Sequence, residues 1–291
     1  MNVEPEKLRG DEPVGIIPSS PERYYFKLFS LFLASNLWTF LMTMIPVLVD
    51  LMPNTMYADH PNWYGGNDVA RFLEPIGGFL FNLYIFLHSG ILSGSYCHGD
   101  KDILVFAFFF GAAIYGQGAG FHSASNMLKN ALESVMEEHN DDLTRDFYYW
   151  IRMVWEHEVS HYLYASGYAL MAFAELAAYR HHTLPDGVTF NRTCSVMLAF
   201  AAMIYALLIA GVAVDFPAGV VVGLIYTVVY GIVGIGLYFR FLRKSLGEGG
   251  LRFGQRPVLN YFIMSYSIAF CLIILWIIVA RGVKDRNGNG V

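Results

Sequence analysis

Long apolar stretches alternate with short polar stretches along most of the 291-residue chain. A helix needs about 20 apolar residues to cross a hydrocarbon layer of about 30 Å, and lipid offers an irregular backbone no hydrogen-bond partner. The pattern therefore predicts an all-α, polytopic transmembrane helix bundle of about seven spans. The expected spans are residues 24–50, 75–96, 103–123, 148–180, 190–213, 218–240 and 257–280.

Between the third and fourth spans, residues 124–146 place apolar side chains at helical spacing opposite lysine and glutamate. This amphipathic pattern predicts a helix that lies in the membrane interface. The sequence predicts three parts of the chain, which are a polar N-terminal tail (1–23), a transmembrane helical domain (24–280) and a polar C-terminal tail (281–291).

The composition agrees with lipid as the solvent. The chain is 55% hydrophobic and 15% charged, whereas soluble domains are about 45–50% apolar and about 25% charged. The net charge of −5 provides no basic surface for a phosphate backbone, so we expect membrane lipids and no nucleic acid as partners. The three cysteines have no CxxC spacing, and neither a disulfide framework nor a thiolate metal site is expected.

The distribution of basic residues predicts the orientation of this multi-pass protein. Lys and Arg are more numerous in the segments on the N-terminal side of the expected spans, which favours a cytoplasmic N-terminus. The sequon Asn191-Arg192-Thr193 lies on the same side and offers a test, because its glycosylation would invert the orientation.

A cluster of ionisable residues interrupts the fourth stretch, in the sequence Trp155-Glu156-His157-Glu158-Val159-Ser160-His161. Two histidines at i and i+4 share one helix face and can reach one metal ion. The His-Glu-x-x-His pattern resembles that of the zincin-like zinc metalloenzymes. The resemblance implies Zn²⁺ on His157 and His161, with Glu158 as the general base for water. Ionisable groups within a span are costly and usually mark a functional site, although a hydrogen-bonded polar seam without metal is the alternative.

A catalytic zinc normally has three protein ligands, so a third residue is needed. His122, at the end of the third expected span, is the first candidate because that end lies on the same membrane side as the start of the fourth. His88 in the second span is the rival. Attack of water on a carbonyl group creates an oxyanion, which hydrogen-bond donors stabilise. The candidate donors near the histidines are the side chains of Asn126, Ser160 and Tyr164.

These observations favour an integral membrane, metal-dependent hydrolase that acts on a lipid or a membrane-embedded peptide. Two alternatives remain open. The first is a b-type haem electron-transfer protein with His88 and His161 as axial ligands. The second is a transporter or a structural subunit of a membrane complex, with Glu156, Glu158 and Glu175 as relay groups.

Overall fold

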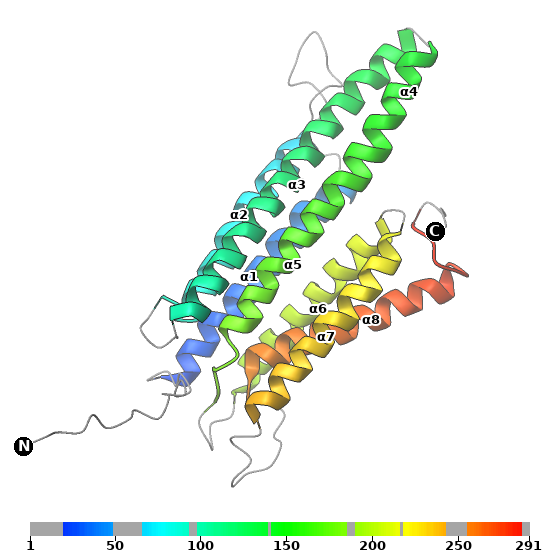
Figure 1. The fold of residues 1–291 in the computed structure, drawn as a ribbon. Coiled ribbons are helices and arrows are strands. Elements are labelled where there is room, and N and C mark those ends of the chain that lie inside the picture. Colours follow the sequence, from blue (N-terminus) through cyan, green and yellow to red (C-terminus); the bar gives the residue numbers. More distant parts are fainter. Residues whose placement is uncertain are drawn as a thin grey trace, which may run out of the picture.

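The computed structural model describes residues 20–48, 66–92, 98–138, 141–184, 190–215, 218–242 and 255–286. These residues form a bundle of helices and contain no β-strand (Figure 1). The elements in chain order are α1 (Pro21–Leu48), α2 (Gly66–His88), α3 (His98–Glu138), α4 (Asp142–Trp150), the π-helix η1 (Ile151–Val159), α5 (Ser160–Ala178), α6 (Arg192–Asp215), α7 (Gly219–Leu242) and α8 (Pro257–Val279).

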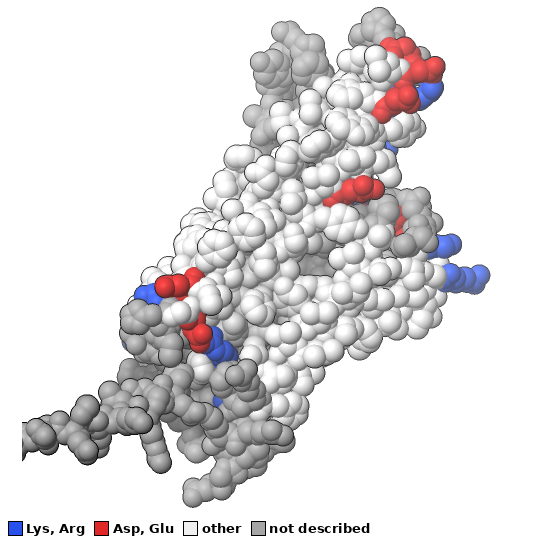
Figure 2. Space-filling view, in the orientation of Figure 1, with Lys and Arg blue, Asp and Glu red and all other residues white. Residues whose placement is uncertain are grey.

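The protein is an all-α, polytopic membrane protein, as the apolar pattern predicts. Within the described ranges, six helices are long and apolar enough to cross a membrane, namely α1, α2, α3, α6, α7 and α8. The fourth expected span, residues 148–180, covers the end of α4, the π-helix η1 and α5, which are not among these six because they have more polar side chains. Helix α1 begins and helix α8 ends at opposite ends of the bundle (Figure 1). Charged side chains gather toward the ends of the visible face, with a broad uncharged band between them (Figure 2).

The second expected span, residues 75–96, is shifted along the chain relative to the helix that forms. Helix α2 begins at Gly66 and ends at His88. It stops there because Gly90 adopts a positive φ of 75°, a conformation that commonly ends helices. The apolar residues Ile91 and Leu92 that extended the predicted span belong to the turn after the helix.

The prediction of a separate interfacial helix at residues 124–146 is wrong in its boundaries, although most of the segment is helical. Residues 124–138 continue α3, which is 41 residues long and therefore about 60 Å, twice the thickness of a hydrocarbon layer. The segment from His122 to Glu138 contains no glycine or proline that would end the helix. The remaining residues begin α4, where the Asp141 carboxylate accepts a hydrogen bond of 2.9 Å from the Thr144 backbone N–H. This bond lowers the pKa of Asp141.

Helices α3 and α5 pack with their backbones in close contact. Glycines lie at the crossing on both sides, because a side chain there would meet the facing backbone. A Cβ on Gly111 would lie 2.8 Å from the Gly167 carbonyl oxygen, and one on Gly118 would lie 2.8 Å from the Tyr164 Cα. The other face of α5 packs on α8 and α6, so α5 contributes to two hydrophobic cores. Its side chains are therefore central in the bundle.

Substitution at Gly118 tests this contact. Gly118→Ala places a methyl group against the Tyr164 backbone and forces the helices apart, with an expected loss of about 1–3 kcal/mol of stability. Gly116→Ala is the matched control, because a Cβ there meets no atom within 4 Å and alanine favours the helix by up to about 1 kcal/mol. Thermal unfolding of the purified protein in detergent measures both. Equal stability of the two variants would contradict the close packing.

Candidate functional site

The predicted ionisable cluster lies where the fourth helical stretch changes its backbone geometry. Residues 151–159 form a π-helix, and the Ser160 N–H donates to the Trp155 carbonyl five residues earlier. The Ser160 hydroxyl also donates to the Glu156 carbonyl. π-Helices account for well under 1% of residues and often occur at functional sites. Here the unusual segment contains both Glu156 and His157.

Three histidines from two neighbouring helical segments meet at this point. The His122 and His161 rings have centroids 5.2 Å apart, and the His157 and His161 rings have centroids 5.6 Å apart. Zn–N bonds of about 2.0–2.1 Å place two tetrahedrally arranged imidazole centroids about 5 Å apart, so these separations have the scale of a shared metal ion. The sequence-predicted grouping of His122, His157 and His161 is therefore present in space.

The rings do not converge on one point. His122 stacks on His161 with an interplanar angle of 29°, so their faces rather than their nitrogen atoms are opposed. Accordingly, no set of three His, Cys, Asp or Glu side chains in the described ranges is arranged to hold a metal ion. All three imidazoles are partly exposed, and rotation about their side-chain torsions is required before their nitrogens can share a ligand.

His88 is not part of this cluster, and its prediction as a ligand is wrong. It is the last residue of α2, and its ring lies 4.3 Å from that of Tyr24. Its neighbour Phe86 stacks on Phe108 at 4.5 Å, and α3 rises about 21 Å between Phe108 and His122. The error follows from the shifted span, which placed His88 in the interior of a helix that in fact ends there.

The predicted haem ligands fail for the same reason. Two axial imidazoles on one haem iron face each other across about 6 Å. His88 and His161 lie toward opposite ends of the bundle, so they cannot ligate one haem. Glu175 is also remote from the histidines, because α5 rises about 21 Å between His161 and Glu175.

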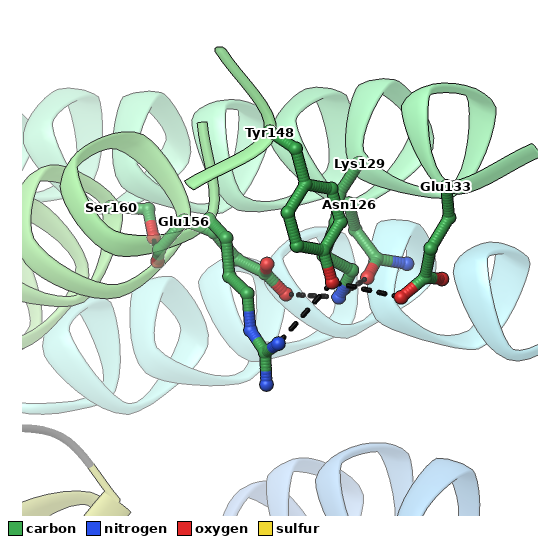
Figure 3. A network of polar contacts seen from close by, with 7 residues as sticks. Asn126, Lys129, Glu133, Tyr148, Glu156 and Ser160 are labelled. Carbon is green, nitrogen blue, oxygen red and sulfur yellow. Dashed lines mark hydrogen bonds and ion pairs between the residues drawn. The ribbon is translucent and has the colours of Figure 1, made fainter. Parts of the chain in front are cut away.

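A buried ion pair joins α3 to the π-helix that carries His157 (Figure 3). The Lys129 ammonium from α3 donates to Glu156 Oε1 and to Asn126 Oδ1, each at 2.9 Å. The side chain of Glu156 is 6% exposed and that of Lys129 is 19% exposed. In the next layer of this network, Tyr148 donates to Glu133 at 2.8 Å. These bonds fix η1 and α4 against α3.

The remaining predicted site residues differ in their surroundings. Glu158 is exposed, so its carboxylate has access to water beside the histidines. Asn126 and Ser160 lie at the site, but the Asn126 side-chain oxygen accepts from Lys129 and the Ser160 hydroxyl donates within its own helix. Tyr164 points into the α3–α5 contact, where its ring lies 4.7 Å from that of Tyr115.

The cluster lies toward the end of the bundle where the C-terminal helices finish. Asp215, the last residue of α6, and Arg286, which follows α8, are both near enough to act electrostatically on His161. Arg286 Nε forms an ion pair of 2.7 Å with Asp215. Two of the apolar helices, α6 and α8, therefore end near the level of the cluster.

Sequence reasoning missed two features of the site, the π-helix and the role of Lys129. The apolar pattern of a π-helix does not differ visibly from that of an α-helix. The lysine did have a signal, because His122, Asn126 and Lys129 follow the i, i+4, i+7 spacing of one helix face.

No protein-family model matches the chain, and no curated protein or solved structure is significantly similar to it. The fold therefore supplies no functional analogy. Arguments about function depend on the residues of the site themselves.

Removal of Lys129 tests the buried ion pair. Lys129→Met leaves the Glu156 carboxylate without its cation, with an expected loss of about 1.5–3 kcal/mol in the free energy of unfolding. Arg145→Met is the control, because its ion pair with Asp142 is exposed and contributes less than about 0.5 kcal/mol. Adding Glu156→Gln to Lys129→Met should restore part of the loss. Equal unfolding free energies of the two single variants would refute the role of the pair.

Proposed function

We propose that the protein is an integral membrane, metal-dependent hydrolase whose zinc ligands are His122, His157 and His161. The observation that carries this proposal is the meeting of the three imidazoles at centroid separations of 5.2 and 5.6 Å. Two of these residues belong to a His-Glu-x-x-His pattern, which resembles that of zinc hydrolases. The third comes from the neighbouring helix.

The surroundings of the histidines suit this chemistry. Bound Zn²⁺ supplies Lewis-acid activation of water and of a carbonyl group. Glu158 is exposed beside His157 and accepts the proton of the attacking water as the general base. Glu156 is a positioning residue, because its ion pair with Lys129 ties the histidine-bearing π-helix to α3.

The position of the site points to the substrate class. The histidines lie near the ends of apolar helices, where an ester or amide carbonyl of a membrane-inserted molecule meets water. A lipid or a membrane-embedded peptide brings its carbonyl to this level with its apolar part still in the hydrocarbon layer. A soluble metabolite would gain nothing from this position.

Metal analysis tests the ligand set. Purified wild-type protein should contain about one zinc ion per chain, and His122→Ala, His157→Ala and His161→Ala should each lower the zinc content at least tenfold. His88→Ala is the matched control and should retain the metal, because His88 packs against Tyr24 far from the cluster. Low and equal zinc in the wild type and all four variants would contradict the proposal.

The same preparations separate metal binding from catalysis. Glu158→Gln should retain zinc but hydrolyse a p-nitrophenyl ester in mixed lipid micelles at least about 100-fold more slowly, because it removes the general base. Unchanged turnover would refute the role of Glu158 as the general base. The zinc content of the histidine variants would still test the three ligands separately.

We further propose that the N-terminus is cytoplasmic, following the excess of basic residues on that side. Asn191 should then remain unmodified when the protein is made in a glycosylating cell, whereas a sequon added after Val291 should be glycosylated. A mobility shift after endoglycosidase treatment detects each event. Modification of Asn191 would reverse the orientation.

A further inference from the structure

A carboxyl group that the proposed hydrolysis does not use is buried in α2. Glu74 lies within the stretch Ala70–His88, which is apolar enough to cross a membrane, and it is 3% exposed. Among the described residues, Glu74 forms no ion pair with a lysine, an arginine or a histidine. An isolated carboxylate is costly in such surroundings, so this group holds a proton or a cation.

Side chains from three other helices bring hydroxyl groups to this carboxyl group. The Tyr115 hydroxyl from α3 donates to Glu74 Oε1 at 2.7 Å. Thr39 from α1 and Tyr164 from α5 lie beside the same carboxyl group, and the rings of Tyr115 and Tyr164 have centroids 4.7 Å apart. We call this set the Glu74 oxygen cluster. It consists of Thr39, Glu74, Tyr115 and Tyr164, so four helices each contribute one oxygen-bearing side chain.

The hydroxyl group of Thr39 is not used by the fold. Thr39 is 5% exposed, and its Oγ1 atom has no hydrogen-bond partner although the side chain lies beside Glu74. A buried hydroxyl group without a partner costs about 1–3 kcal/mol. Packing alone therefore does not favour threonine at this position, because valine has the same shape without this cost. An oxygen with free lone pairs beside a carboxylate is instead suited to coordinate a cation.

The backbone of α2 leaves room for the cluster. Gly78 follows Glu74 by one helical turn, and a Cβ there would lie 2.7 Å from the Tyr115 hydroxyl oxygen and 3.5 Å from Glu74 Oε1. A side chain at this position would therefore push the Tyr115 hydroxyl away from the carboxyl group. On the other side, Trp38 Nε1 donates to the Glu74 carbonyl oxygen at 2.9 Å. This bond attaches α1, which carries Thr39, to the same turn of α2.

We propose that the Glu74 oxygen cluster binds one monovalent alkali-metal cation, with the Glu74 carboxylate as the charged ligand and the three hydroxyl oxygens as neutral ligands. Hard cations prefer oxygen ligands. A single carboxylate cancels the charge of a monovalent cation, whereas a divalent ion would leave a net charge in the apolar interior. The Tyr115 hydroxyl donates its proton to the carboxylate and keeps its lone pairs for the cation. This function goes beyond the proposed hydrolysis and shares no ligand with the zinc site.

The dependence of thermal unfolding on the salt tests the proposal. The full chain is purified in a neutral detergent, and its unfolding temperature is measured in NaCl, KCl and choline chloride at equal concentration. Choline is monovalent but too large for a site between packed helices, so it corrects for ionic strength. A ligand that binds only the folded state stabilises it, so NaCl or KCl should raise the wild-type unfolding temperature at least about 3 °C above the choline value. The salt with the larger shift identifies the preferred cation.

Variants of the cluster assign this shift to its site. Glu74→Gln should abolish the difference between the salts, because it keeps the shape of the side chain and removes its charge. Thr39→Val should reduce the difference by about half, because it removes one ligand, without lowering the stability in choline chloride. Asp142→Asn is the matched control, because the Asp142 side chain is 89% exposed, and it should keep the wild-type difference. Only the salts are compared within each variant, so a change in basal stability does not imitate the result.

Two outcomes overturn the proposal. The first is an equal wild-type unfolding temperature in all three salts, which indicates a carboxyl group that keeps its proton. The second is the wild-type difference between the salts in both Glu74→Gln and Thr39→Val. If Glu74→Gln does not fold, Thr39→Val decides the question against Asp142→Asn. Zinc content, measured separately, does not enter this comparison.

Discussion

The close contact between α3 and α5 determines the rest of the arrangement. Gly111 and Gly118 on one helix and Gly167 on the other remove the side chains that would separate the backbones. Small residues at such crossings are how membrane helices associate without a hydrophobic driving force. Because His122 lies just beyond Gly118 and His161 just before Tyr164, the same contact brings the two imidazoles together.

The two buried carboxyl groups on the helical stretch formed by η1 and α5 have different environments. Glu156 has Lys129 as a counter-ion, and its position in the π-helix directs it toward α3. Glu175 is 2% exposed, and its Oε1 atom has no hydrogen-bond partner. The two carboxyl groups on one helical stretch therefore differ in role, because only that of Glu156 ties helices together through its charge.

The helical class and the grouping of His122 with His157 and His161 were predictable, since long apolar runs and i, i+4 spacing reflect direct physical constraints. The end of α2 was not predictable, because the apolar residues Ile91 and Leu92 follow the turn at Gly90 and prolong the apolar pattern past the end of the helix. For this reason the rival ligand His88 was misplaced. The continuation of α3 past residue 123 was missed, because an amphipathic segment has the same pattern in a helix along a surface as in a hairpin of two packed helices.

The length of α3 has a mechanical consequence. Its segment from His122 to Glu138 has no glycine or proline hinge, and Tyr148 and Lys129 tie it to the returning chain. The hairpin is therefore braced, and the histidine cluster lies at its inner end. Because its two arms are tied together, a displacement of the outer end moves His122 and the π-helix as one unit.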